Sequence, residues 1–233
     1  MTERKIIKKN ARDVLANNIF SEKWLLLALL LFVYSLILSV TVTIGAYTFG
    51  LGSILELVIG GALELGVTRA LIGVVTKKDE KADFNKLLSG FDKTFTKTLV
   101  HNLLKTLFIA LWTLLLVIPG IIKYYAYSLS YYCFNENNDL EWNECLKKSQ
   151  EKMKGYKMKL FVLDLSFIGW YIVGLLCLGI GVFFVQPYHQ AARTLFLLEV
   201  LNDGKEVDEL NTVSDEVPRE ETTEETKEEA QEE

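Results

Sequence analysis

The chain has 233 residues, half of them hydrophobic, and its formal net charge is −5. With a positive mean hydropathy, this hydrophobic share is high for a soluble protein. The charge is uneven: residues 203–233 hold 14 acidic and 3 basic residues, a charge of −11, which leaves +6 on residues 1–202. The body of the chain is therefore apolar and basic, whereas its tail is acidic and polar.

Apolar runs of about 20 residues, the length that crosses a bilayer core of about 30 Å, recur along the chain. They cover 24–45, 51–75, 99–118, 160–178 and 182–201, with a shorter arm at 121–137. The first run follows a basic segment, as in a signal peptide, but it is too long and no small-residue cleavage site follows it. The runs predict an all-helical, multi-pass membrane domain over residues 1–202. The first run is expected to stay in the protein as a membrane span.

Basic residues predict the orientation of these runs. They cluster at Arg4–Lys23, Lys77–Lys105 and Lys147–Lys159, whereas the segment "GAYTFGLG" between the first two runs carries no charge. The positive-inside rule places all three clusters in the cytoplasm, so an even number of crossings separates each neighbouring pair. The expected protein is a six-span bundle of three helical hairpins in the cell membrane, with both termini cytoplasmic.

The hairpin turns are predicted from proline and glycine. One helix from Leu99 to Asn135 would be about 55 Å long, more than one crossing needs. Pro119 and Gly120 favour a tight reversal at the outer surface, with Lys123 reaching the headgroups just beyond it. Because the arm after this turn is short, a re-entrant half-helix covered by protein is the alternative. Gly179 and Gly181 predict the last outer turn.

Each expected hairpin follows an amphipathic segment. Apolar side chains recur at helical spacing in "DFNKLLSGFDKTF" and "EWNECLKKSQEKM", and "ERKIIKKNARDVLANNIF" is a basic counterpart. Asn138 and Glu141 resemble a capping box before the second of these segments. We expect the three helices to lie on the inner leaflet, with their lysines facing anionic lipid headgroups.

Polar residues at membrane depth are the candidate functional residues, because such residues are costly in a bilayer and face the bundle interior. In chain order they are Glu56, Glu64, Arg69, Lys123, Asp164, Gln186, His189, Gln190 and Arg193. Residues 186, 189, 190 and 193 form one stripe on a helix. Depth favours ion pairs of Asp164 with Arg193 and of Glu56 with Lys123, and leaves Glu64 near the midplane without a partner.

Two interpretations of these polar residues remain open. Glu64, His189 and Arg193 are candidates for lining a solute, ion or proton path. Alternatively, paired polar groups fix the packing of the helices, which is a common use of such residues in membrane bundles. An intramembrane enzyme is a third hypothesis, although the chain has no zinc-protease motif, nucleophile elbow or Walker A loop.

Neither a cofactor nor a metal site is predicted. The chain has two histidines and three cysteines, and the cysteines have neither metal-ligand spacing nor the even count of a disulfide framework. The acidic segment 203–233 is too polar to form a core, so we expect a disordered cytoplasmic tail, either a solvating tail or an interaction arm. We expect no nucleic-acid partner. The expected partners are membrane lipids, another protein or a second copy of the chain.

Four stretches resemble a family of bacterial integral membrane proteins known as domain-of-unknown-function family 975. They are "DFNKLLSGF" at 83–91, "LWTLLLVIPGIIKYYAYS" at 111–128, "SQEKMKGYKMKLFVLDLSFIGW" at 149–170 and "LGIGVFFVQPYHQAA" at 178–192. The resemblance implies a membrane protein without an assigned function, so it supplies no catalytic or binding residues. The expected function is a non-catalytic accessory or scaffold protein, and the alternative is a small transporter using the polar stripe.

Overall fold

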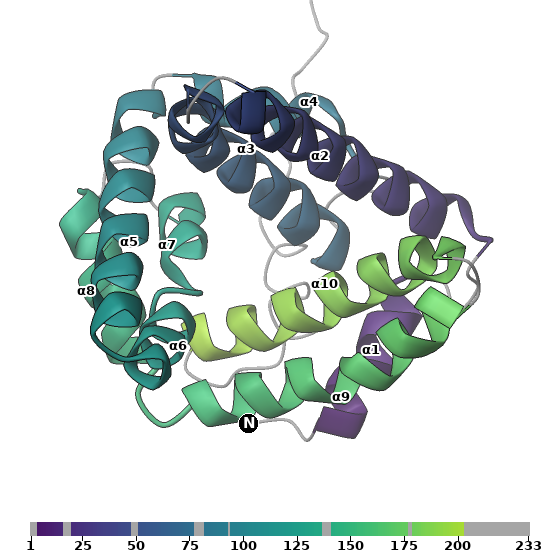
Figure 1. Ribbon diagram of the computed structural model, residues 1–233. Helices are drawn as coiled ribbons and strands as arrows, with labels where there is room; N and C mark the ends of the chain where they lie inside the picture. Colours follow the sequence, from purple (N-terminus) through teal and green to yellow (C-terminus); the bar gives the residue numbers. More distant parts are fainter. Residues whose placement is uncertain are drawn as a thin grey trace, which may run out of the picture.

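The computed structural model describes residues 4–15, 20–47, 51–76, 82–92, 94–136, 141–176 and 179–202. Within these ranges every regular element is a helix, which confirms the all-helical fold class (Figure 1). The helices are α1 (Arg4–Val14), α2 (Glu22–Tyr47), α3 (Leu51–Val75), α4 (Asn85–Leu88), the 3₁₀ turn η1 (Ser89–Phe91), α5 (Phe95–Leu115), α6 (Val117–Ala126), α7 (Ser130–Glu136), α8 (Trp142–Lys152), α9 (Lys157–Leu176) and α10 (Ile180–Leu201).

Four of the described helices are long and apolar enough to cross a membrane. They are Glu22–Ile44 of α2, Leu55–Val75 of α3, Phe95–Leu115 of α5 and Lys157–Leu176 of α9. α10 has 22 residues but carries the polar stripe, and α6 and α7 have 10 and 7 residues, which is less than one crossing needs. The structure therefore does not confirm six spans.

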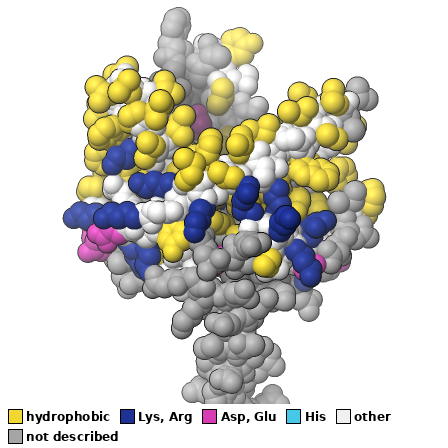
Figure 2. Space-filling view, turned by 90° about the horizontal axis from the view of Figure 1, so that it is seen from below, with side chains coloured by type: hydrophobic (Ala, Val, Ile, Leu, Met, Phe, Trp, Pro, Cys, Tyr) yellow, Lys and Arg dark blue, Asp and Glu magenta, His cyan; other side chains and the backbone are white. Residues whose placement is uncertain are grey.

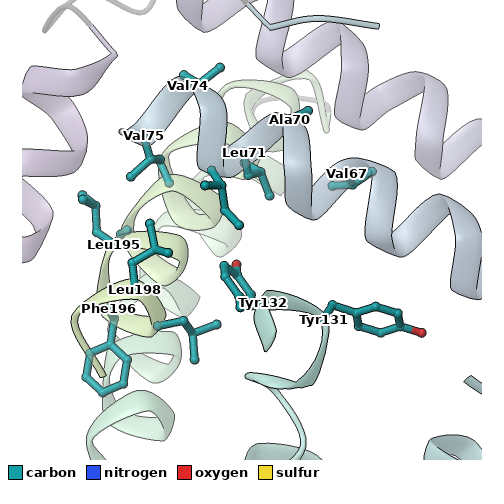
Figure 3. Packing of buried hydrophobic residues seen from close by; sticks show 14 of the residues in the cluster. Val67, Ala70, Leu71, Val74, Val75, Tyr131, Tyr132, Leu195, Phe196 and Leu198 are labelled. Atoms are coloured by element: carbon teal, nitrogen blue, oxygen red, sulfur yellow. The ribbon is translucent and has the colours of Figure 1, made fainter. Parts of the chain in front are cut away.

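Consecutive long helices pack against each other. α2 packs on α3, α5 on α6 and α9 on α10, and the three pairs surround a common centre (Figure 1). Of the described helices, α3 and α10 contribute the most residues to the core there. Figure 3 shows Val67, Leu71 and Val75 of α3 together with Leu195 and Leu198 of α10 and two tyrosines of α7.

Burial decreases toward the turns that join the helices of each pair. Leu114 at the end of α5 is 86% exposed, and Leu176 at the end of α9 is 78% exposed. Soluble monomers rarely expose apolar patches of this extent. Figure 2 shows hydrophobic lobes above a band of lysine and arginine side chains, a distribution that fits a membrane protein.

The chain reverses between α5 and α6 at Leu116, not at Pro119 and Gly120 as predicted. Leu116 is extended, with φ −159° and ψ 134°, and Pro119 lies in the first turn of α6, where a missing N–H breaks no helical hydrogen bond. Gly120 instead lets α6 approach α5, because an added Cβ would lie 2.1 Å from Thr113 Oγ1. Gly179 lies at the turn before α10 with φ 79°, and Gly181 packs on Gly174.

The short amphipathic helices bury their apolar faces in the protein. Ile7 and Ala11 of α1 are buried, and α1 packs on α10. Cys145, Leu146 and Ser149 of α8 are also buried. The segment at 84–95 forms only α4 and η1 before α5 begins. Asn138 lies outside the described residues, and the Glu141 backbone N–H donates instead to Glu144.

Candidate functional site

Asp164 is the centre of a polar cluster between α6, α9 and α10. Its carboxylate accepts hydrogen bonds from His189 Nε2 at 3.0 Å, Arg193 at 3.1 Å and the Tyr125 hydroxyl at 3.1 Å. The predicted ion pair of Asp164 with Arg193 is therefore present. The Asp164 side chain is 15% exposed and the Arg193 side chain 16%, so the ion pair is largely buried within the protein.

Two further tyrosines complete this cluster, which we call the Asp164 cluster. The Tyr171 hydroxyl lies 3.0 Å from His189 Nδ1, and Arg193 donates to the Tyr124 hydroxyl at 3.4 Å. Because a carboxylate only accepts hydrogen bonds, His189 Nε2 carries a proton, and the Tyr171 hydroxyl can then donate to Nδ1 of a neutral imidazole. Every charged or imidazole group of the cluster thus has a partner from another helix.

Glu64 has a partner, contrary to the prediction from the sequence. Lys105 Nζ on α5 donates to Glu64 Oε1 on α3 at 2.9 Å and lies 4.4 Å from the centre of the Tyr131 ring. Lys105 belongs to a basic cluster that we assigned to the cytoplasm, and its sequence position gives no sign that it turns into the bundle. The pair links two neighbouring helix pairs.

Lys123 does not pair with Glu56. Its ammonium donates to Gln150 of α8 at 3.2 Å and lies over the rings of Trp112 and Tyr127. The prediction assumed that α6 begins after Gly120. Because the turn comes at Leu116, Lys123 lies in the last turn of α6, where α8 is within reach.

The remaining candidates take minor positions. Arg69 donates to the Ser89 carbonyl at 2.8 Å and to its hydroxyl at 3.1 Å, which fastens η1 to α3. Gln186 and Gln190 are half-buried on α10. The polar stripe therefore contributes two of its four residues, His189 and Arg193, to the Asp164 cluster.

Sequence reasoning missed the tyrosines and a buried histidine. The run "KYYAYSLSYY" supplies Tyr124, Tyr125 and Tyr131, whose hydroxyls cannot be assigned to partners without the fold. His101 is fully buried on α5 and lies 2.9 Å from the Ser130 hydroxyl. His101 lies four residues before Lys105 on the same helix, so the two share a helix face, and this spacing was the available signal.

The described residues include no group of three or more His, Cys, Asp or Glu side chains that could hold a metal ion. The arrangement instead joins helices: the Asp164 cluster links α6, α9 and α10, and Glu64 with Lys105 links α3 and α5.

Fold and site together define an all-helical protein with four described helices suited to crossing a membrane. The chain belongs to the family described as Protein of unknown function (DUF975), which it matches over residues 1–124 and 113–203. No curated protein matches it. No solved structure matches it either.

Proposed function

We propose that this is a non-catalytic integral membrane protein of the cell membrane, an accessory or scaffold protein that organises anionic lipids and partner proteins at the inner leaflet. The observation that carries the proposal is the band of basic side chains directly below the exposed apolar surface (Figure 2). Each basic residue close to an anionic membrane surface adds about 1 kcal/mol of attraction.

Helix α1 supports this assignment in detail. Its apolar face packs on α10, so the exposed face presents Arg4, Lys5, Lys9 and Arg12 away from the core. Lys8, on the side of α1 near α9, donates to the Ser166 carbonyl at 3.3 Å. Burial lowers the pKa of Lys8, and neighbouring Arg4 and Arg12 lower it further, because α1 concentrates positive charge.

The pairing of the polar residues also favours a scaffold. A conducting path needs polar groups that are free to exchange partners with a solute, whereas His189 and Arg193 are both bonded to Asp164. Paired polar side chains between helices are a common means of fixing membrane bundles.

For the topology we propose six crossings with both termini in the cytoplasm and 203–233 as a cytoplasmic tail. In this arrangement the fourth crossing is broken into α6 and α7, and the sixth is α10, whose polar stripe is covered by α9 and α6. Irregular backbone at membrane depth is tolerated where protein covers it, and α7 is largely buried.

Electron spin resonance of headgroup-labelled lipids at the protein surface tests the proposed function. The wild type should select phosphatidylglycerol over phosphatidylcholine, and replacing Lys5, Lys9 and Arg12 with glutamine should reduce that selectivity by about tenfold or less, as expected for partly screened surface charges. The control exchanges lysine and arginine at the same positions and should keep it. Equal selectivity in all three proteins would reject the proposal.

Transport remains the second candidate, because Glu64 is 40% exposed despite its ion pair. If Glu64, His189 and Arg193 line a path, alanine at each position should abolish uptake into vesicles while the folded protein survives. If they only fix the packing, thermal stability should fall as well.

A further inference from the structure

Helix α1 is fixed to the bundle by one face and presents the opposite face outward. Ile7 is 3% exposed and Ala11 is fully buried, and α1 lies beside α9 and α10 (Figure 1). The Lys8 ammonium donates to the Ser166 carbonyl at 3.3 Å and lies 4.3 Å from the centre of the Phe167 ring. Because these contacts fix the rotation of α1 about its axis, its outward face is a defined surface.

The outward face of α1 carries an excess of positive charge, and we call it the α1 basic face. Its exposed basic side chains are Arg4, Lys5, Lys9 and Arg12. Within the described parts of the chain, none of these four side chains makes an ion pair or a hydrogen bond. The acidic side chains nearest in sequence are Asp13 of α1 and Glu22, the first residue of α2. The α1 basic face therefore offers positive charge to an acidic partner.

The acidic C-terminal segment begins within reach of this face. The Phe167 ring lies between α1 and α10, with its centre 4.3 Å from Lys8 Nζ and 5.0 Å from the centre of the Tyr188 ring. Tyr188 precedes Asn202 by about 20 Å along α10, at 1.5 Å per residue. Residues 203–233 span at most about 110 Å. Chain length therefore allows the end of the segment to contact α1.

The acidic segment and α1 repeat their charges at the same interval. In "EETTEETKEEAQEE", residues 220–233, pairs of glutamates recur every four residues. In "RKIIKKNAR", residues 4–12, the basic residues recur at the same spacing. Residues three or four apart share one face of a helix, and four residues rise about 6 Å. Sign and spacing of the charges thus both favour residues 220–233 as the partner of the α1 basic face.

We propose that residues 220–233 dock on the α1 basic face of the same chain, with their glutamate pairs against Lys5, Lys9 and Arg12. Single surface ion pairs are weak, so the docking depends on several pairs that form together within one chain. Anionic lipids need the same basic side chains, so the docked segment competes with them. This competition rests on the proposed function, whereas the docking itself does not.

Carbodiimide cross-linking of the full-length protein in phosphatidylcholine nanodiscs tests the docking, because it joins a lysine to a carboxylate that touches it. Peptide mass spectrometry should find Lys5 or Lys9 joined to glutamates of residues 220–233. Lys147 and Lys154, exposed lysines of the third basic cluster, are the internal controls and should react several-fold less. In about 1 M salt, where the Debye length is about 3 Å, the cross-links should largely disappear.

Three outcomes of the cross-linking would overturn the docking. The first is the absence of cross-links at Lys5 and Lys9, and the second is an equal yield at Lys147 and Lys154. The third comes from a mixture of isotope-labelled and unlabelled protein. Cross-links that join the two kinds as often as copies of one kind would assign the contact to two chains.

Neutralising two glutamate pairs tests the competition with lipid. The variant replaces four carboxylates of the repeat with their amides, at Glu220, Glu221, Glu224 and Glu225. The matched control removes the same number outside the repeat, at Glu206, Asp208, Glu209 and Asp215. In the electron spin resonance assay, the first variant should raise the selectivity for phosphatidylglycerol several-fold and the control should raise it less. Equal effects would overturn the assignment to residues 220–233.

The two assays separate the docking from the proposed function. If no protein selects phosphatidylglycerol while Lys5 and Lys9 still cross-link, the proposed lipid function fails and the docking stands. Lipid selectivity without these cross-links rejects the docking alone. Normal cross-linking together with unchanged lipid selectivity in the variant of the repeat would overturn the competition.

Discussion

At the scale of single residues, the polar side chains act as links between helices. Asp164 accepts three hydrogen bonds, from α6 and α10, and Glu64 joins α3 to α5. Residue depth alone was enough to predict the Asp164–Arg193 pair, because both positions can be counted from the ends of their apolar runs. Depth failed to predict the partner of Glu64. That partner, Lys105, lies on α5, and counting residues does not show which way a side chain of α5 faces.

A double-mutant cycle should detect the link between Asp164 and Arg193. We expect Asp164→Asn to destabilise the protein by about 2 kcal/mol, since it leaves a largely buried guanidinium without its carboxylate. The coupling energy of Asp164→Asn with Arg193→Gln should be about 1–2 kcal/mol, near the upper end for polar contacts in membrane bundles. Unfolding in detergent measures it, and additive effects would show that the pair contributes no stability.

Cys145 offers a test of burial outside the spanning helices. Burial raises the pKa of its thiol to about 12. A thiolate then forms in the unfolded chain at lower pH than in the folded protein, so the folded state loses stability as the pH rises above about 9. We also expect Cys145 to resist maleimide at pH 8 until the protein unfolds, as measured by peptide mass spectrometry. Rapid labelling of Cys145 in the folded protein would contradict the burial of its thiol.

At the scale of elements, glycines decide how closely the helices approach. A Cβ on Gly66 of α3 would lie 2.1 Å from the Leu87 carbonyl oxygen, and one on Gly90 of η1 would lie 2.0 Å from the Ala62 carbonyl oxygen. The segment from α4 to η1 thus rests directly on the backbone of α3. The amphipathic spacing at 84–95 predicted one helix here and missed this backbone contact, which joins residues far apart in the sequence, Gly66 to Leu87 and Gly90 to Ala62.

Replacing Gly66 with alanine should destabilise the protein by about 1–3 kcal/mol, the usual cost of overpacking. Gly169→Ala on α9 is the matched control, because a Cβ there meets no atom within 4 Å. That change should be neutral or stabilise by up to about 1 kcal/mol through helix propensity. Thermal unfolding in detergent compares the two variants, and equal melting temperatures would argue against the close approach.

At the scale of the whole molecule, the sequence was sufficient to predict the helical class and the positions of the apolar helices. Hydrophobic runs and charge clusters are local properties, so they can be counted along the chain. The sequence predicted a short return arm but placed its turn at Pro119 and Gly120 instead of Leu116, because Pro119 fits the first turn of a helix as well as a tight reversal. It also could not predict how far burial decreases toward the turns, which depends on packing between distant segments.

The proposed topology requires that all three turns between paired helices face one side of the membrane and the basic clusters the other. Cysteine accessibility in intact cells tests this most directly. Single cysteines are placed, in a cysteine-free background, at Tyr47, Leu116 and Ile180 near the turns and at Lys9 and Lys147 in the first and third basic clusters. An impermeant maleimide applied from outside should label the first three and not the last two. Labelling of Lys9→Cys, or protection of Leu116→Cys while Tyr47→Cys and Ile180→Cys react, would contradict it.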